Sequence, residues 1–127
     1  MLQSNVYESK LRNINKKVGE FANSQPDTVH AFSSLRKATL KTGVLDLKTK
    51  ELIALAIAVA SQCDGCIAFH VDHALEAGAS AQEIQEALSV AVLMGGGPAL
   101  VYATHAIDAV SELSDMRDDE PVPRYFD

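Results

Sequence analysis

The chain has 127 residues, of which 47% are hydrophobic and 22% charged, and its formal net charge is −6. This composition is that of one globular domain with a real core, and it excludes a disordered chain. The negative charge argues against non-specific nucleic-acid binding and against an anionic membrane surface, so we expect neither partner.

No export or membrane segment is evident in the sequence. The first ten residues lack the apolar core of a signal peptide, and the longest apolar run, Leu52–Ala60, is too short to cross a bilayer. We therefore expect a cytoplasmic protein. In that compartment a lone Cys-x-x-Cys is more often catalytic or metal-binding than a structural crosslink.

The first two predicted helices are amphipathic and span residues 6–22 and about 26–41. In the first, apolar residues recur at spacings of three and four: Leu11, Ile14, Val18 and Phe21. Pro26 suits the first turn of the second helix, which Thr42 and Gly43 end.

The next two predicted helices carry the most informative residues. Asp46 is a candidate N-cap for a helix over residues 47–62, which is apolar nearly all round after Glu51. We expect this helix to be central and buried. The following helix starts near Asp64 to Cys66 and runs to Ala77, with Gly78 in the position after its C-cap.

Two more helices complete the predicted fold. Ser80 and Glu83 form a capping box that opens a fifth helix to about Met94, and Gly95–Gly97 form a sharp break. Pro98 starts a sixth helix to about Leu113. No period-two apolar alternation appears, so the prediction is one all-α domain over residues 1–127, of about six helices, with a flexible acidic tail over residues 114–127.

The two cysteines of the chain, Cys63 and Cys66, are three positions apart, and His70 follows one helical turn later. Thiols at this spacing can close into a disulfide within a single turn. Cys66 lies in the first turn of its helix beside the His70 imidazole, and both features should lower the pKa of its thiol below the usual value of about 8.5. We therefore predict that Cys66 is the nucleophile and Cys63 the resolving thiol.

Glu51 opens a stripe on the preceding helix, and a carboxylate on so apolar a helix is costly unless it is paired. If that stripe faces the cysteines, Glu51 could exchange protons with Cys63. Equally, Glu51 could be a first-turn carboxylate that interacts with the helix dipole.

Other interpretations of the cysteines stay open. They could be two small buried hydrophobic residues. They could also bind zinc together with His70, although one turn rarely supplies three tetrahedral ligands. Of the other histidines, we expect His73 at the surface or core edge and His30 in solvent or an interface. His105 could line the pocket or sit satisfied in the core.

The pattern Glu51-x11-Cys63-x2-Cys66-x3-His70 resembles the signature of the carboxymuconolactone decarboxylase and AhpD superfamily, closest to its alkylhydroperoxidase branch. The resemblance covers residues 26–113 and includes the lead-in from Leu45 to Glu51 and the later Met94-Gly-Gly-Gly-Pro98. It implies an AhpD-like helical fold that is an obligate homo-oligomer, as a homotrimer or homohexamer.

The resemblance also implies an antioxidant enzyme, an alkyl hydroperoxidase that uses neither metal nor organic cofactor. Cys66 would be the peroxidatic cysteine, Cys63 the resolving one, and Glu51 with His70 the proton relay; the partners would be a peroxide substrate and a thiol or dithiol reductant. The best-characterised AhpD pattern has histidine immediately before the second cysteine, where this chain has Gly65. The alternatives are a decarboxylase-like lyase and a non-enzymatic redox switch.

Overall fold

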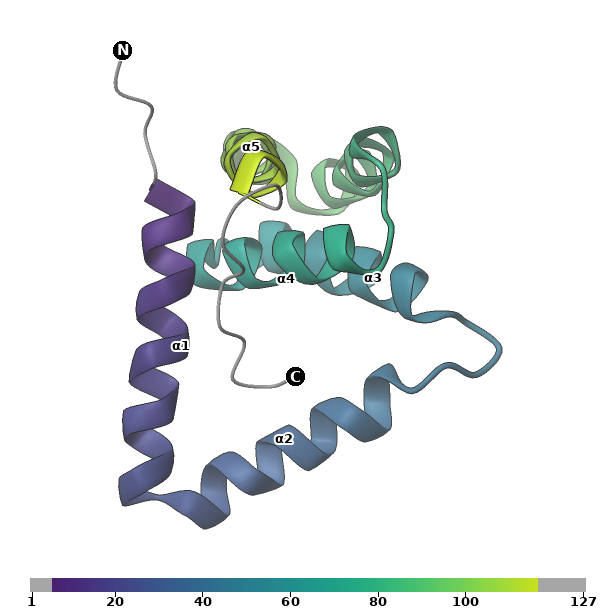
Figure 1. The fold of residues 1–127 in the computed structure, drawn as a ribbon. Coiled ribbons are helices and arrows are strands. Elements are labelled where there is room, and N and C mark those ends of the chain that lie inside the picture. The colour runs from purple at the N-terminus through teal and green to yellow at the C-terminus, as the bar shows by residue number, and fades with distance from the viewer. Residues whose placement is uncertain (1–5, 117–127) are drawn as a thin grey trace.

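The computed structural model describes residues 6–116, and these residues form helices joined by short loops, without a β-strand (Figure 1). The helices are α1 (Val6–Ser24), α2 (Pro26–Leu40), α3 (Leu47–Ala60), α4 (Asp64–Glu76) and α5 (Ala81–Met116). The predicted all-α fold is confirmed. The first, second, third and fifth predicted helices start within one residue of α1, α2, α3 and α5, and the range predicted for the start of the fourth includes Asp64, where α4 begins.

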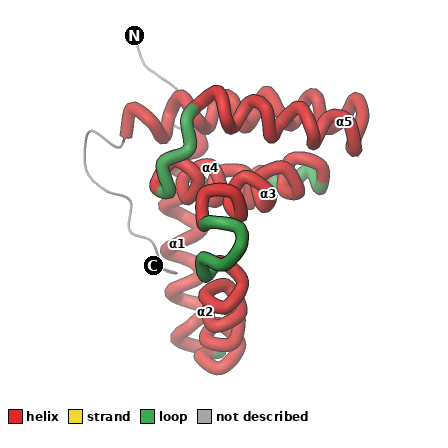
Figure 2. Tube along the Cα trace, turned by 90° about the vertical axis from the view of Figure 1, so that its right-hand side faces the viewer, coloured by secondary structure: helices red, strands yellow, loops and turns green. Residues whose placement is uncertain are grey.

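Helices α3, α4 and α5 pack against one another and form the centre of the molecule. Helix α5 lies across α3 and α4, while α1 and α2 extend away from this centre (Figures 1 and 2). Helix α1 contacts α2, α4 and α5, whereas α2 touches α3 only near its end. There the Lys50 ammonium donates to the carbonyl oxygens of Thr39 and Lys41, at 2.9 and 2.6 Å, and so satisfies the last turn of α2.

Small side chains let the central helices approach closely. The fully buried larger residues come from four helices: Leu11, Leu55, Val59, Ile67, Val71, Ile84 and Leu113. Buried alanines fill the space between them, mostly on α4 and α5: Ala68, Ala74, Ala91, Ala99, Ala103, Ala106 and Ala109. Because apolar burial contributes about 25 cal/mol per Å², this cluster is the main source of stability in the fold.

The predicted break between the fifth and sixth helices is a kink within α5. Gly96 has non-helical torsion angles (φ 71°, ψ −153°), and Pro98 follows it, so α5 consists of two helical segments that meet there. The prediction of a tail from residue 114 was wrong at its start, because α5 continues through Met116. The remainder of the predicted tail lies outside the described residues.

The predicted helix caps are present. Asp46 accepts a hydrogen bond from the Thr49 backbone N–H at 2.8 Å. The interaction with the Thr49 side chain, followed by this backbone contact, lowers the pKa of Asp46. The box at the start of α5 is reciprocal: the Glu83 carboxylate accepts from Ser80 N–H at 2.9 Å, and Ser80 Oγ accepts from Glu83 N–H at 3.0 Å.

The ends of α3 and α4 share one backbone arrangement. At the end of α4, Ala79 N–H bonds Ala74 O and Gly78 N–H bonds Leu75 O, with Gly78 left-handed at φ 93°. This is a Schellman motif, and glycine is the favoured residue there.

At the end of α3 the same motif is formed without glycine. Cys63 N–H bonds Ala58 O, Gln62 N–H bonds Val59 O, and Gln62 takes the left-handed conformation at φ 57°. The chain therefore accepts a strained residue immediately before Cys63.

Helices α3 and α2 each leave apolar side chains exposed. Helix α3 was predicted to be central and buried, and Leu55 and Val59 are buried, yet Ile53 and Ile57 are exposed on it. Helix α2 buries Val29, whereas Phe32 and Leu35 are about half exposed. Both results have one cause: within the described residues, a face of each helix has no neighbouring helix.

Among the described helices, α5 alone is long and apolar enough to meet the length and composition criterion for a membrane span. Core helices of water-soluble proteins meet the same criterion. Here α5 is kinked at Gly96 and packs on α3 and α4.

The two Schellman motifs give a matched test of the left-handed backbone. We expect Gly78→Ala to lower the free energy of unfolding by about 1 kcal/mol, because a β-carbon is disfavoured at positive φ and nothing else lies within 4 Å of it. Gln62→Ala should change it by less than about 0.5 kcal/mol, since that position already carries a β-carbon. Urea unfolding measures both. Equal losses in the two variants would contradict this interpretation.

Candidate functional site

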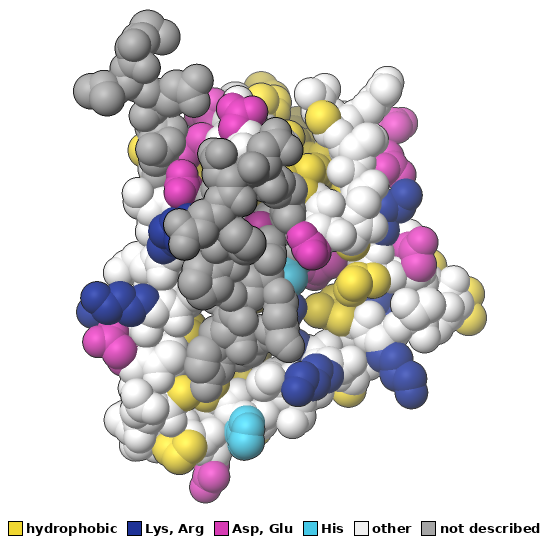
Figure 3. All heavy atoms as spheres, in the orientation of Figure 1, with side chains coloured by type: hydrophobic (Ala, Val, Ile, Leu, Met, Phe, Trp, Pro, Cys, Tyr) yellow, Lys and Arg dark blue, Asp and Glu magenta, His cyan; other side chains and the backbone are white. Residues whose placement is uncertain are grey.

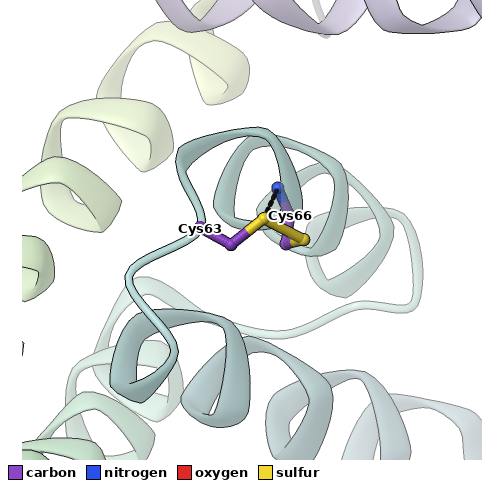
Figure 4. Close-up of a disulfide and its surroundings, with 2 residues drawn as sticks. All are labelled: Cys63 and Cys66. Carbon is purple, nitrogen blue, oxygen red and sulfur yellow. Dashed lines mark hydrogen bonds between the residues drawn. A yellow bond between two sulfur atoms is a disulfide. The ribbon is translucent and has the colours of Figure 1, made fainter.

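The two cysteines lie where the chain enters α4 (Figure 4). Cys63 is the N-cap of α4, and its Sγ accepts a hydrogen bond from the Cys66 backbone N–H at 3.3 Å. The two sulfur atoms are joined in a disulfide, with the Cα atoms 5.2 Å apart. Cys66 is exposed and Cys63 is half-buried. The sequence prediction that this pair can form a disulfide is therefore confirmed.

The position of this disulfide favours thiol chemistry. Backbone N–H groups at a helix start stabilise negative charge, and here one of them already points at the Cys63 sulfur. After reduction the same N–H can stabilise a thiolate on Cys63, while the exposed Cys66 sulfur is the one that an external molecule can reach.

Glu51 and His70 form the second part of the site. The side chain of Glu51 is 1% exposed, and its Oε1 lies 3.3 Å from His70 Nδ1. A buried carboxylate accepts, so Nδ1 carries the proton in this contact and Nε2 remains available as a base. Glu51 therefore contacts His70. The sequence had left open a contact between Glu51 and Cys63, and the structure does not show that contact.

The other oxygen of this carboxylate, Glu51 Oε2, is buried without a hydrogen-bond partner. Glu51 also lines a cavity of about 440 Å³ between α2, α3 and α4. The cavity lies toward the end of α4, because His73, Glu76 and Ala77 line it and the cysteines do not. Glu51 therefore stands between this cavity and His70, at a point where protons can pass between the site and its surroundings.

A second polar cluster surrounds Asp64, the residue that follows Cys63. Asp64 Oδ1 lies 2.8 Å from His105 Nδ1, and the Tyr7 hydroxyl donates to the same oxygen at 3.5 Å. The Tyr102 ring packs against the His105 ring, with centroids 4.7 Å apart. Burial, followed by the charge of Asp64, raises the pKa of Tyr7 to about 12, so Tyr7 remains a neutral donor at physiological pH.

The sequence indicated His105 as a possible pocket residue but did not reveal its partner Asp64, or the role of Tyr7. The Asp64 carboxylate between the two cysteines was a visible signal, but His105 and Tyr7 are 41 and 57 residues away from it in the chain. Gly65 has a steric explanation: an added β-carbon would lie 3.1 Å from Ile14 Cδ1, because α1 crosses the start of α4 there. A histidine at this position would meet α1.

The remaining histidines lie apart from the cysteines. His73 Nδ1 donates to Phe69 O at 2.8 Å and its ring stacks on Phe69, at the core edge where it was expected. His30 is exposed on α2, which agrees with the prediction that it lies in solvent or an interface. Among residues 6–116, no three His, Cys, Asp or Glu side chains are grouped so that they could hold a metal ion.

Comparison with protein families and known sequences identifies relatives over most of the chain. The sequence model of the carboxymuconolactone decarboxylase family matches residues 26–109. An uncharacterized protein of Cupriavidus necator is 38% identical over 100 residues, which cover 79% of this chain and 88% of that protein. An uncharacterized protein of Haemophilus influenzae is 39% identical over 98 residues, covering 77% and 87% of the two chains.

Solved structures of the same family have the same fold. A carboxymuconolactone decarboxylase family protein from Legionella pneumophila superposes with a TM-score of 0.85 at 44% identity, covering 87% of this chain and 99% of that one. A family protein from Thermotoga maritima, possibly involved in antioxidative response, gives a TM-score of 0.68 at 31% identity, with coverages of 80% and 93%.

The contact between Glu51 and His70 predicts a role for the imidazole in thiol activation. In the reduced protein, we expect His70→Ala to shift the pH profile of Cys66 alkylation by iodoacetamide upward by up to roughly one unit, because the nearby proton acceptor is lost. His30→Ala, on the exposed face of α2, is the matched control and should leave the profile in place. If both variants follow the unaltered protein, His70 has no part in activating the thiol.

Proposed function

This chain belongs to the carboxymuconolactone decarboxylase family, and we propose that within it the protein is an AhpD-like alkyl hydroperoxidase, a thiol–disulfide oxidoreductase that reduces peroxides. Family membership supports an AhpD-like or a decarboxylase-like function. One observation carries the choice: the Cys63–Cys66 disulfide at the start of α4, one turn before the His70 that is hydrogen-bonded to buried Glu51.

The proposed reaction begins from the reduced protein. The Cys66 thiolate attacks the terminal oxygen of the peroxide, the O–O bond breaks, and the departing alkoxide takes a proton and leaves as the alcohol. Cys66 is then a sulfenic acid. The Cys63 thiolate attacks the Cys66 sulfur and displaces the hydroxyl group, which leaves as water once protonated, and the disulfide forms.

The two sulfurs suit these separate roles. Cys66 is exposed, as the atom that meets the peroxide must be. The Cys66 N–H that bonds Cys63 Sγ would stabilise the Cys63 thiolate during resolution. The same contact favours Cys63 as leaving group when a thiol or dithiol donor attacks the Cys66 sulfur and supplies two electrons.

Glu51 and His70 would move the protons. His70 follows Cys66 by four residues on α4, so the two side chains are neighbours on one helix face. Its Nδ1–H is held by the Glu51 carboxylate, which leaves Nε2 to take the thiol proton and return it to the alkoxide. A buried carboxylate stabilises the imidazolium that forms in between.

Two other functions are distinguishable. A decarboxylase-like lyase would act on a carboxylactone after both cysteines were replaced, because that chemistry does not need a dithiol. A non-enzymatic redox switch would react with peroxide once per molecule and show no steady-state turnover with a donor. A cytosolic location belongs to our proposal, since a reducing compartment would return the disulfide to the dithiol.

We further propose that the working form is a homotrimer or homohexamer. Large apolar side chains are exposed on α1, α2, α3 and α5, and apolar side chains are visible on the face shown in Figure 3. They include Leu35 on α2, Ile57 on α3, and Leu93 and Met94 on α5, and Leu93 is 80% exposed. Exposed apolar surface of this kind is typical of surfaces that pack against another subunit.

Replacing each cysteine separately tests the roles of the two sulfurs. Cys66→Ser should abolish peroxide-dependent turnover, because the attacking thiolate is lost. Cys63→Ser should still consume one equivalent of peroxide and stop as a sulfenic acid, which mass spectrometry detects after trapping. Oxidation of Cys63 in Cys66→Ser, together with an unreacted thiol in Cys63→Ser, would reverse the assignment.

The assembly has its own test. Size-exclusion chromatography with light scattering should give three or six times the 13.6 kDa subunit mass. Leu93→Glu should lower that mass because it places a charge on an exposed apolar site of α5, whereas Gln82→Glu, at an exposed polar position of the same helix, should not. A single active peak at the subunit mass would rule out the assembly.

A further inference from the structure

Asp64 places a carboxylate between the two cysteines. It is the first residue of α4, directly after Cys63 and two residues before Cys66. A carboxylate this close disfavours a thiolate through like-charge repulsion. It also competes with the thiolate for the positive end of the same helix. A dithiol that works through a thiolate therefore needs this negative charge to be offset.

His105 of α5 supplies the offset. Its Nδ1 lies 2.8 Å from Asp64 Oδ1, a charge-assisted distance, and the two side chains are about one third exposed. The carboxylate only accepts, so Nδ1 is the protonated nitrogen. When His105 is doubly protonated its charge opposes that of Asp64, and when it is neutral it still donates to the carboxylate.

The other groups around this pair are anionic or neutral. Tyr7 of α1 donates its hydroxyl to Asp64, and Asp108 and Glu112 of α5 raise the pKa of Tyr7 through their charges. The Glu112 carboxylate also accepts the Tyr7 backbone N–H at 3.0 Å. When it is protonated, His105 adds positive charge to a cluster in which Asp64, Asp108 and Glu112 are acidic.

We infer that His105 is a positioning residue for the dithiol, one that acts through Asp64 to raise the thiolate fraction and stabilise the reduced form. This inference rests on the redox dithiol of the proposed function and not on peroxide as the oxidant. It also gives the motif an imidazole from outside, on α5, where the chain has Gly65 and not histidine between the cysteines.

The inference predicts opposite effects for the two partners. In the reduced protein at pH 7, His105→Gln should slow alkylation by iodoacetamide, and Asp64→Asn should accelerate it, each by roughly threefold to tenfold. The reagent is uncharged, so its rate reports the thiolate fraction. In redox buffers of glutathione, His105→Gln should shift the equilibrium toward the disulfide and Asp64→Asn toward the dithiol.

The double variant identifies the route of the effect. Because His105 acts through Asp64, adding His105→Gln to Asp64→Asn should change neither the alkylation rate nor the redox equilibrium. His30→Gln, at an exposed position on α2, is the control and should match the unaltered protein. Circular dichroism verifies that each variant is folded.

Three results would overturn the inference: an unchanged alkylation rate in His105→Gln, an unchanged or slower rate in Asp64→Asn, or the full effect of His105→Gln in the Asp64→Asn background. If His105→Gln fails to fold, the alkylation rate of Asp64→Asn tests the inference by itself. No peroxide enters these measurements, so a protein without peroxidase turnover can still satisfy them. Conversely, a negative result in these measurements would not contradict the peroxidase proposal, which is tested by turnover with peroxide.

Discussion

The hydrogen bond between Glu51 and His70 is the contact on which the arrangement of the site depends. A carboxylate that is 1% exposed on an apolar helix is costly to bury, and the imidazole of the facing helix is the partner that offsets this cost. The contact links α3 to α4 at the residue one turn after Cys66. The Schellman motif at Gln62 joins the same two helices and places Cys63 as the cap of α4.

Two polar pairs therefore flank one disulfide, and their surroundings differ. The Glu51 carboxylate is 1% exposed and lines the cavity between α2, α3 and α4, so its interaction with His70 is shielded from bulk water. Asp64 and His105 are partly exposed, so water and salt weaken their interaction. The first pair is suited to directed proton transfer, and the second to adjusting the average charge beside the sulfurs.

The outer helices define where other molecules can act. Helix α1 crosses the start of α4 so closely that a β-carbon at position 65 would lie 3.1 Å from Ile14 Cδ1, and Tyr7 on α1 reaches Asp64. Helix α2 buries only Val29 and forms one wall of the cavity beside Glu51. A single chain thus brings the polar groups of the site together while it leaves part of its apolar surface uncovered.

What the sequence determined by itself was local. Residue preferences that act within about four residues explain the local features. These features are the helix starts, the caps at Asp46 and Ser80, the break near Gly96, and the disulfide spacing of Cys63 and Cys66. The pattern of Glu51, the cysteines and His70 also pointed to the family.

The tertiary structure decided which polar groups meet. Glu51 contacts His70, 19 residues later in the chain, and not Cys63. Asp64 contacts His105, which is 41 residues later. The same packing left one face of α2 and of α3 exposed although their sequences are apolar enough for burial. Helical periodicity identifies a side of a helix but not the neighbour on that side. That neighbour depends on how the alanine-rich core lets the helices approach.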